Sequence, residues 1–333
     1  MVGRSVRRPP CGRFAPSPTG DLHVGSALAA LGAWASARSQ GGRFVWRVED
    51  LDAPRAVAGS AERQMADARW LGLDWDEGPD VGGPHGPYRQ SERGAVYDRA
   101  LERLAQAGRL FPCRVSRADL RAVASAPHGP LPPYPAALRP RDLAPDWYRD
   151  PAARADAALR FRVAPGVVTW TDGVAGPQAQ DVAADVGDVV LRRRDGVTAY
   201  QLAVVVDDLA MGVTEVVRGR DLVDSTARQV QIARALCGPV PRYAHLPLVV
   251  AGGGPVADDA ARKLSKRDGS LTVRSLRQSG MTAPALVGWL AQALGHGDGA
   301  PCTPADLART FSLSRVRPEP VVVSEDLTRL LLP

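Results

Sequence analysis

The sequence predicts an α/β fold, in which a doubly wound parallel sheet carries an inserted α+β subdomain and a small helical C-terminal region. Three observations support this prediction. Strand-like and helix-like segments alternate through the first hundred residues, and this order favours parallel strands joined by helices. A proline-rich, irregular stretch from Pro127 to Pro145 then interrupts the alternation. The alternation resumes near residue 189 and ends in a clear helix.

The first half of the core is predicted over residues 12–110. Apolar side chains recur there at helical or strand spacing, and turn residues separate the segments. We expect, in order, a short strand ending in a rigid turn (12–20), a helix (22–38), a strand (43–48) and two helices (61–71 and 95–107).

Residues 111–185 are predicted to form the inserted subdomain, with short strands at 161–163 and 167–170. The core should resume over 186–250, and residues 251–295 should hold a glycine-rich lead and a last helix. The tail, 296–333, is weakly patterned. The elements expected after the insert are strands at 189–191, 200–206 and 246–250, and helices at 225–236 and 284–294, with the second strand ending at Asp207 and Asp208.

Composition indicates an ordinary globular protein of 333 residues, 45% apolar and 23% charged. No apolar run reaches the ~18 residues that a membrane span needs. The N-terminus lacks the apolar stretch of a secretory signal, so we expect a cytoplasmic protein with no membrane partner. A net charge of +6 fits a polyanionic partner such as nucleic acid, although many basic proteins simply have solvated basic surfaces.

The cysteines and lysines are informative by their spacing. The four cysteines are far apart, which argues against a disulfide framework and against a self-contained zinc finger.

Of 42 basic residues only Lys263 and Lys266 are lysines, and they fall within one short segment. A compact ammonium on a flexible stem suits contact with a moving phosphate, so two lysines here could clamp a triphosphate. The alternative is a solvated basic turn.

Three further segments carry candidate site residues. The stretch from Arg13 to Ser26 delivers His23 and Gly25 to a helix N-terminus, which favours anions. His23 could instead cap the helix or lie on the surface. Glu49 follows a predicted strand, at the edge of a parallel sheet that faces ligands, and could bind an amino group. A solvated acidic turn explains the same residues equally well.

Arg218 lies in the segment Val-Val-Arg-Gly-Arg-Asp, close to two acids. Its guanidinium is suited to grip a carboxylate with two parallel hydrogen bonds. An interior Arg–Asp ion pair is the alternative.

Together these segments resemble class I aminoacyl-tRNA synthetases in their glutamyl form. Residues 13–25 resemble the HIGH signature and Lys263 to Arg267 the KMSKS signature, with Arg-Val-Glu-Asp-Leu-Asp and Val-Val-Arg-Gly-Arg-Asp-Leu between them. The resemblance covers about residues 12–295 and implies a Rossmann-type core. It implies a glutamate site of Arg13, Ala15, Ser17, Glu49, Tyr200 and Arg218, and an ATP site of His23, Gly25, Lys263 and Lys266, with His23 and both lysines catalytic.

Only 66 residues follow Arg267, whereas a glutamyl-tRNA synthetase carries a separate anticodon-binding region there. The chain therefore resembles the shortened glutamyl-queuosine tRNA(Asp) synthetases. That resemblance implies activation of L-glutamate with ATP without tRNA, and transfer to the queuosine base in the anticodon loop of tRNA(Asp). The alternatives are a truncated enzyme that charges a tRNA 3′ end and a non-catalytic paralogue that binds tRNA or an amino acid.

The resemblance also implies Mg²⁺ with ATP, and we expect a monomer. Relatives often carry a Cys-x-Cys and Tyr-x-x-x-Cys zinc site in the insert. This chain has Cys113 and Tyr134 but Val115 and Leu138 at the other two positions. Because one thiolate and one phenol cannot make a tetrahedral zinc site, no metal is predicted. The insert should hold its shape by packing, with Trp147, Tyr148 and the prolines.

Overall fold

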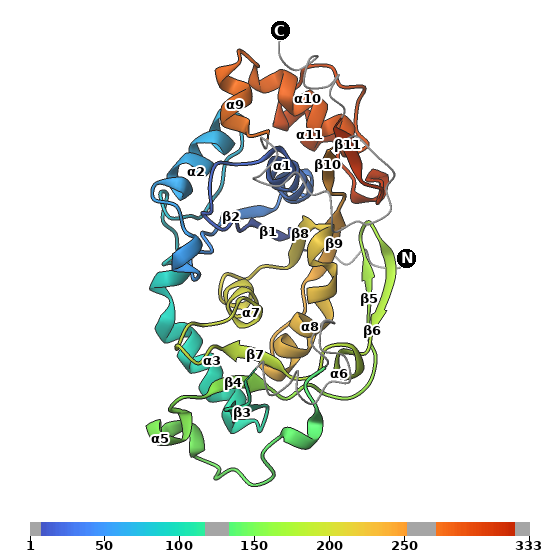
Figure 1. Cartoon of the computed structure of the whole chain (residues 1–333). Coiled ribbons are helices and arrows are strands. Elements are labelled where there is room, and N and C mark those ends of the chain that lie inside the picture. Colours follow the sequence, from blue (N-terminus) through green and yellow to red (C-terminus); the bar gives the residue numbers. More distant parts are fainter. Residues whose placement is uncertain (1–7, 117–132, 252–270, 324–333) are drawn as a thin grey trace.

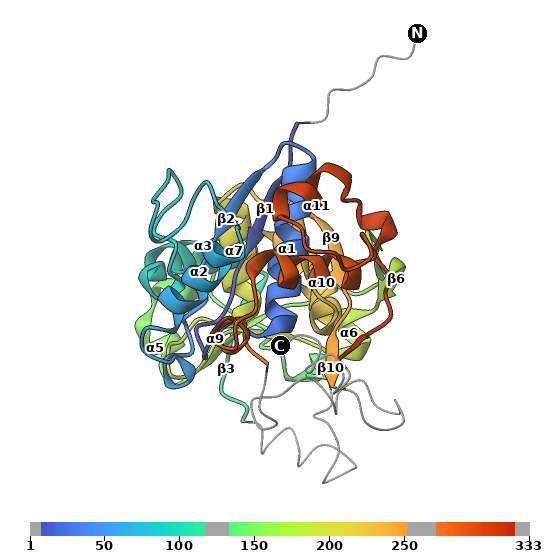
Figure 2. The same ribbon diagram turned by 90° about the horizontal axis from the view of Figure 1, so that it is seen from above.

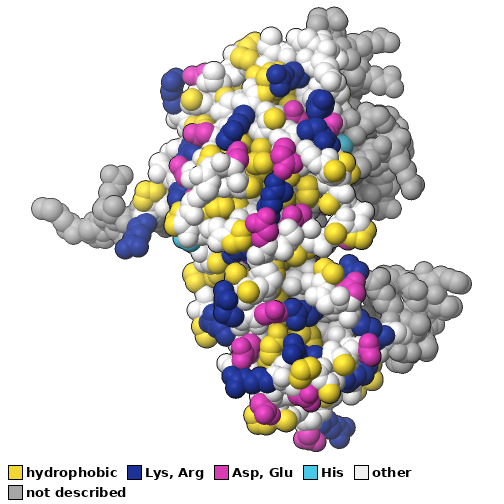
Figure 3. Space-filling model, turned by 90° about the vertical axis from the view of Figure 1, so that its left-hand side faces the viewer, with side chains coloured by type: hydrophobic (Ala, Val, Ile, Leu, Met, Phe, Trp, Pro, Cys, Tyr) yellow, Lys and Arg dark blue, Asp and Glu magenta, His cyan; other side chains and the backbone are white. Residues whose placement is uncertain are grey.

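The structure, a computed structural model, describes residues 8–116, 133–251 and 271–323. The molecule is elongated, with the parallel core and C-terminal helices at one end and the insert at the other (Figure 1). A narrower waist separates the two parts (Figure 3). The helices are α1 Val24–Ser39, α2 Ser60–Trp70, α3 Gly94–Gln106, α5 Pro151–Arg154, α6 Val182–Asp185, α7 Tyr200–Ala210, α8 Thr226–Ala235, α9 Val273–Gln278, α10 Ala283–Ala293 and α11 Pro304–Thr310. The strands are β1 Cys11–Phe14, β2 Arg43–Trp46, β3 Leu110–Cys113, β4 Ala158–Phe161, β5 Val168–Asp172, β6 Gly176–Gln180, β7 Val189–Arg192, β8 Glu215–Gly219, β9 Arg242–Leu246, β10 Val249–Ala251 and β11 Val321–Val323.

Parallel strands form the centre of the core, as predicted. β1 pairs in parallel with β2, and β8 pairs in parallel with β9. β8 lies beside β1, where the N–H of Thr214 donates to the carbonyl of Cys11 at 2.9 Å. The four strands therefore stand in the spatial order β2, β1, β8, β9 (Figure 1). The α/β class is confirmed, and the five helices that the sequence predicts, now α1, α2, α3, α8 and α10, begin and end within two residues of their predicted bounds.

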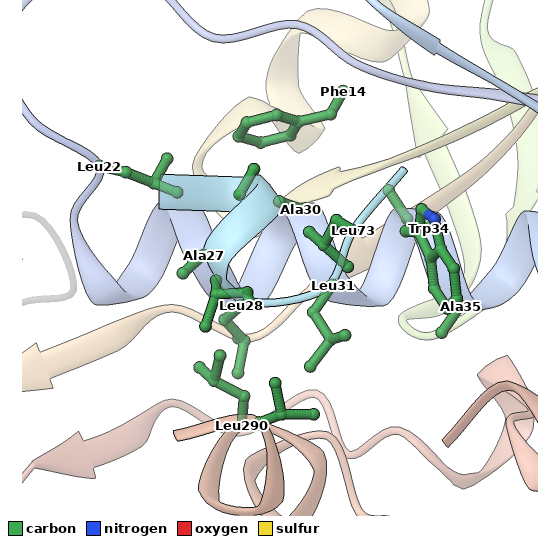
Figure 4. Close-up of a cluster of buried hydrophobic side chains, with 14 of the residues drawn as sticks. Phe14, Leu22, Ala27, Leu28, Ala30, Leu31, Trp34, Ala35, Leu73 and Leu290 are labelled. Carbon is green, nitrogen blue, oxygen red and sulfur yellow. The ribbon is translucent and has the colours of Figure 1, made fainter. Parts of the chain in front are cut away.

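Helix α1 is buried on both sides, and its apolar residues form the centre of the hydrophobic core. Phe14 packs above it and Leu290 of α10 below it, with Leu28 and Leu31 between them (Figure 4). From above, α10 and α11 lie over α1 (Figure 2). A Cβ added at Gly32 would meet Leu246 Cδ1 at 2.6 Å, so glycine lets α1 approach β9 closely. This packing fixes the N-terminus of α1 against the sheet.

The insert is built on an antiparallel sheet in the order β3, β4, β7. The sequence analysis placed the strand at 189–191 in the parallel core, and this was wrong, because β7 pairs antiparallel with β4. The hairpin of β5 and β6 reaches the core, where the N–H of Gly173 donates to the carbonyl of Tyr243 at 2.8 Å. The domain boundaries themselves stay a prediction.

The predicted strand at 200–206 is instead the helix α7. A continuous apolar run of this length does not distinguish a buried strand from a buried helix by periodicity. Residues 202–208 are all buried in α7, so its β-branched residues are packed from every side and burial overrides their strand preference. The consequence is that Asp207 and Asp208 point in different directions into the interior instead of marking a strand end.

The predicted strand at 246–250 is divided between β9, which ends at Leu246, and β10, which begins at Val249. Pro247 stands between them and has no N–H for a ladder. The tail contributes structure that its sequence did not suggest: β11 pairs in parallel with β10, and α11 packs against α1. Within the described ranges, no helix is long and apolar enough to cross a membrane.

Candidate active site

A cleft of about 710 Å³ opens where the carboxyl ends of β1 and β8 meet the first turn of α1. Parallel α/β sheets bind their ligands at this edge. Lys263 and Lys266 lie outside the described residues. All other site residues expected from the sequence line this one cleft: Arg13, Ala15, Ser17, His23, Gly25, Glu49, Tyr200 and Arg218.

The turn between β1 and α1 is held by side chains of α2. The Ser60 hydroxyl donates to the carbonyl of Gly20 at 2.6 Å and accepts from the N–H of Gly20 at 3.0 Å. The Gln64 amide donates to the carbonyl of Ser17 at 3.2 Å and to that of Gly20 at 2.8 Å. These bonds give the turn a fixed shape, so the backbone that lines the cleft is set before any ligand binds.

His23 precedes the first residue of α1, with an extended backbone. Its side chain makes no capping hydrogen bond, so the helix-cap alternative is wrong, and it lines the cleft instead. A Cβ added at Gly25 would meet Val249 Cβ at 3.6 Å, an ordinary contact. The protein itself therefore does not need glycine at this position. The first-turn N–H groups of a helix and its dipole favour an anion here.

The chain on either side of the lysine segment meets the N-terminus of α1. On one side is Val249, the neighbour of Gly25. On the other, the carbonyl of Leu271 accepts from the N–H of Val24 at 3.1 Å, and the N–H of Val273 donates to the carbonyl of Leu22 at 2.8 Å. The described residues on either side of 252–270 thus lie beside the cleft.

Arg13 is a buried cation on β1. Its Nη1 donates to the carbonyl of Val217 at 3.1 Å, and its Nε lies 3.7 Å from Oδ1 of Asp208. Burial lowers the pKa of Arg13, and the Asp208 carboxylate opposes that change. An arginine nevertheless keeps its proton in a protein, so Arg13 brings positive charge to the cleft wall.

Arg218 on β8 is held by neutral groups. Nε donates to Nε2 of His245 at 3.0 Å, and Nη1 donates to Oε1 of Gln229 at 2.8 Å. Nη2 donates to the carbonyl of Leu222 at 3.1 Å and to the Thr226 hydroxyl at 3.0 Å. None of the ion pairs among the described residues includes Arg218, so the expected alternative of an Arg–Asp pair is wrong.

A guanidinium has five N–H groups, and four of those of Arg218 have these partners. One Nη1 hydrogen is left for a ligand. A two-pronged grip on a carboxylate would require Arg218 to release one of its present partners.

Glu49 is a buried carboxylate, and the solvated-turn alternative is therefore wrong. Its Oε1 accepts from Nη2 of Arg47 at 3.0 Å. Arg47 is completely buried and also donates to Oδ1 of Asp208 at 2.8 Å, while its Nε lies 3.7 Å from Oδ2 of Asp207. Burial raises the pKa of Glu49, and the neighbouring Arg47 guanidinium opposes the rise. Glu49 is thus set in place as an anion at the cleft wall.

Tyr200, the first residue of α7, lines this cleft and a second one of about 680 Å³. Burial raises the pKa of Tyr200, so its phenol stays neutral and can both donate and accept. The two clefts also share Ser17, Glu49 and Arg55. The second cleft lies between the core and the insert, and its further cations are Arg160, Arg193 and Arg194.

In the insert, Cys113 and Tyr134 are in contact. The thiol donates to the phenol oxygen at 3.5 Å, and the phenol donates to the carbonyl of Leu138 at 3.2 Å. The guanidinium carbon of Arg160 lies 4.2 Å from the centre of the Tyr134 ring. The described residues contain no group of three His, Cys, Asp or Glu side chains that could hold a metal. Trp147 and Tyr148 are buried and in edge contact, as the packing hypothesis expects.

Sequence reasoning missed the partners of two charged site residues, Glu49 and Arg218. Arg47 precedes Glu49 by two positions and could have been noticed, because residues i and i+2 of an extended segment share a face. His245 and Asp172 gave weaker signals. The first is a single histidine in an apolar strand, and the second stands before a glycine and resembles an ordinary turn residue.

The comparisons with known proteins agree with the geometry. A family described as tRNA synthetases class I (E and Q), catalytic domain, matches residues 11–311. A protein of Symbiobacterium thermophilum named glutamyl-Q tRNA(Asp) synthetase is 51% identical over 318 residues, which are 93% of this chain and 95% of that protein. A protein of Nitratidesulfovibrio vulgaris with the same name is 45% identical, over 95% of this chain and 96% of its own length.

A solved structure of similar shape is that of a glutamate tRNA ligase from Elizabethkingia meningosepticum in complex with its amino acid. The TM-score is 0.81 at 26% identity, and the match covers 97% of this chain and 69% of that one.

Proposed function

Because this chain belongs to the class I tRNA synthetases for glutamate and glutamine, and within them to the glutamyl-Q tRNA(Asp) synthetases, we propose that it activates L-glutamate with ATP and transfers the glutamyl group to queuosine in the anticodon loop of tRNA(Asp). Activation would need no tRNA. With ATP and tRNA as substrates, the reaction would take place in the cytoplasm, and the working unit would be a monomer.

One observation carries the proposal: two buried cations and one buried carboxylate meet in a single cleft. L-Glutamate has two carboxylates and one ammonium, so Arg13 and Arg218 match its anions and Glu49 its cation. Ala15 and Ser17, on the fixed turn, and Tyr200 would complete the glutamate site. Arg218 has a single free Nη1 hydrogen among its described contacts, so it would direct one hydrogen bond at a carboxylate.

ATP would bind at the N-terminus of α1. His23 and Gly25 line the cleft there, and the described residues that flank the lysine segment lie beside them. Lys263 and Lys266 would reach the phosphates from that segment. Mg²⁺ would accompany ATP and would be held mainly by phosphate oxygens, as is usual for nucleotides.

The first step would be attack of the glutamate α-carboxylate oxygen on the α-phosphorus of ATP. The bond from that phosphorus to the bridging oxygen breaks, and pyrophosphate leaves with the charge. No protein nucleophile is required, so catalysis rests on positioning and charge stabilisation. Lys266 would contribute most to stabilising the charge of the transition state.

In the second step, a hydroxyl of the queuosine cyclopentene ring would attack the activated carbonyl. AMP leaves and the hydroxyl proton passes to solvent. The second cleft suits this acceptor, because it joins the first at Glu49 and Tyr200 and presents Arg160, Arg193 and Arg194 to a polyanion.

Glutamate-dependent ATP–pyrophosphate exchange by the purified protein without tRNA tests the first step. Robust exchange is expected. Exchange that begins only after tRNA(Glu) is added would instead favour an enzyme that charges a 3′ end, and silence in both cases would favour a non-catalytic binder.

The acceptor is tested with tRNA(Asp) prepared with and without queuosine. Labelled glutamate should be incorporated only into the queuosine-containing tRNA. Periodate oxidation of the tRNA without queuosine provides the control, because that tRNA has only its 3′-terminal diol to lose. Incorporation into this tRNA that periodate abolishes would refute the proposed acceptor.

The role of Lys266 is tested by Lys266→Ala, which should reduce exchange strongly and leave thermal unfolding unchanged. Arg274→Ala, an exposed cation on α9, is the matched control and should keep normal exchange. Near-normal rates in Lys266→Ala would remove its assigned role.

A further inference from the structure

Arg218 differs from the other buried arginines of the site in having no acidic partner among the described residues. Its four hydrogen-bond partners are an imidazole nitrogen, an amide oxygen, a carbonyl and a hydroxyl. Arg47, by contrast, contacts Glu49 and Asp208 directly. Burial of a cation without a counter-ion is costly, so the charge of Arg218 needs an explanation.

The charge of Arg218 is linked to a carboxylate through His245 on the neighbouring strand β9. In the parallel pairing of β8 with β9, Arg218 is in register with His245. His245 is completely buried, and its Nδ1 lies 2.5 Å from Oδ2 of Asp172 on β5. Asp172 is therefore the nearest carboxylate in this direction, one residue removed from the guanidinium.

The hydrogen bonds fix the tautomer of His245. The Nε of an arginine is always a donor, so Nε2 of His245 must offer a lone pair to Arg218. The ring proton then sits on Nδ1 and is donated to Asp172. Burial lowers the pKa of His245 and favours this neutral form. Burial also opposes ionisation of Asp172, but the hydrogen bonds from His245 and from the N–H of Ala175 lower the pKa of Asp172 to about 2.

We propose that Asp172 and His245 are positioning residues for amino-acid recognition: they orient Arg218 through a neutral imidazole and keep its counter-ion out of the cleft, so that a substrate carboxylate meets an unneutralised cation. A carboxylate bound directly to Arg218 would satisfy the charge within the protein. Because the Asp172 carboxylate instead lies behind the imidazole of His245, the positive charge of Arg218 faces the ligand. This device favours glutamate over the uncharged glutamine side chain. It rests on the proposed function, in which glutamate binds in this cleft.

Asp172→Asn tests the tautomer, because the orientation of the new amide is determined by the fold. Oδ1 of Asp172 accepts from the N–H groups of Val174, Ala175 and His245, at 3.0, 2.9 and 3.0 Å. Three donors can face only the oxygen of an asparagine, so its NH₂ must face Nδ1 of His245. The ring proton then moves to Nε2, where it opposes the N–H of Arg218.

Two readouts on the intact protein follow from this. With ¹⁵N-labelled histidine, the His245 signals should report the Nδ1–H tautomer in the wild type and the Nε2–H tautomer in Asp172→Asn. In ATP–pyrophosphate exchange, the variant's KM for glutamate should rise about 10- to 100-fold. Its KM for ATP should stay unchanged, and its preference for glutamate over glutamine should fall.

A second pair of variants serves if Asp172→Asn does not fold. His245→Gln keeps an acceptor for Arg218 and should retain a lower glutamate KM than His245→Leu, which has none.

Each result decides one question. An Nε2–H or imidazolium form of His245 in the wild type would overturn the proposal without any variant. So would a switched tautomer with an unchanged glutamate KM, or equal losses in His245→Gln and His245→Leu. Absence of glutamate-dependent exchange in the wild type would instead refute the proposed function, and this proposal with it.

Discussion

Replacing Arg47 with methionine tests whether the buried charges around Glu49 depend on one guanidinium. Arg47 is completely buried, with Glu49 at 3.0 Å, Asp208 at 2.8 Å and Asp207 at 3.7 Å. Methionine has similar length and no charge. The substitution leaves Arg13 and Arg93 to balance these three carboxylates.

Removing one partner of a buried ion pair costs about 3–5 kcal/mol, because the remaining charge is left uncompensated. Domains of ordinary stability have about 5–15 kcal/mol in total, so Arg47→Met should lose a large part of the unfolding free energy at pH 8. Arg38→Met is the matched control: Arg38 also contacts two acids, Asp74 and Asp76, but both are exposed. A surface pair of this kind contributes about 0–1 kcal/mol.

The loss should also depend on pH. In the wild type, Arg47 opposes the burial that raises the pKa of Glu49, so its removal raises that pKa further. A carboxyl with a raised pKa binds more protons folded than unfolded, and the folded state therefore gains stability as pH falls toward the unfolded value of about 4.3.

Urea unfolding of the wild type and both variants at pH 8 and pH 5.5 measures this. The gap between Arg47→Met and the wild type should be several kcal/mol at pH 8 and smaller at pH 5.5. A loss no greater than that of Arg38→Met, or a gap that does not change with pH, would refute the argument that these carboxylates depend on Arg47.

Three further predictions concern the cleft and the insert. Gly25→Ala should fold normally, since its Cβ would meet Val249 at an ordinary 3.6 Å, but raise the KM for ATP about 10-fold or more in pyrophosphate exchange; an unchanged KM would remove Gly25 from the ATP site. Because burial raises the pKa of Glu49, its carboxylate should become protonated, and the KM for glutamate should begin to rise, as the pH is lowered toward a value still above the ordinary Glu pKa of about 4.3. Glu49→Gln should bind glutamate weakly at every pH and should lack that pH dependence. Metal analysis of the purified protein should find no stoichiometric zinc, and Cys113→Ser should leave the metal content unchanged; one zinc per chain would contradict the packing account of the insert.

The sequence by itself determined much of the site. His23 and Glu49 could be selected because they stand next to a predicted helix start and a predicted strand end, and signals of this kind are local in the chain. Arg13 and Arg218 were assigned to the glutamate site by the resemblance and by the fit of a guanidinium to a carboxylate. The structure then brings them to one cleft at the carboxyl ends of β1 and β8. Five of the helices also followed from the spacing of apolar residues and, for α1, from its many alanines.

Other features were decided only by the tertiary structure. Residues 200–206 became helix α7 because they are packed on all sides, and a uniformly apolar segment carries no period that distinguishes helix from strand. The setting of Arg218 depends on His245, 27 positions along the chain, and on Asp172, 73 positions from that histidine. Such contacts arise from strand pairing and from a hairpin that reaches across from the insert. No local pattern in the sequence encodes that groups so far apart in the chain will meet, and so the setting of Arg218 could be read only from the folded chain.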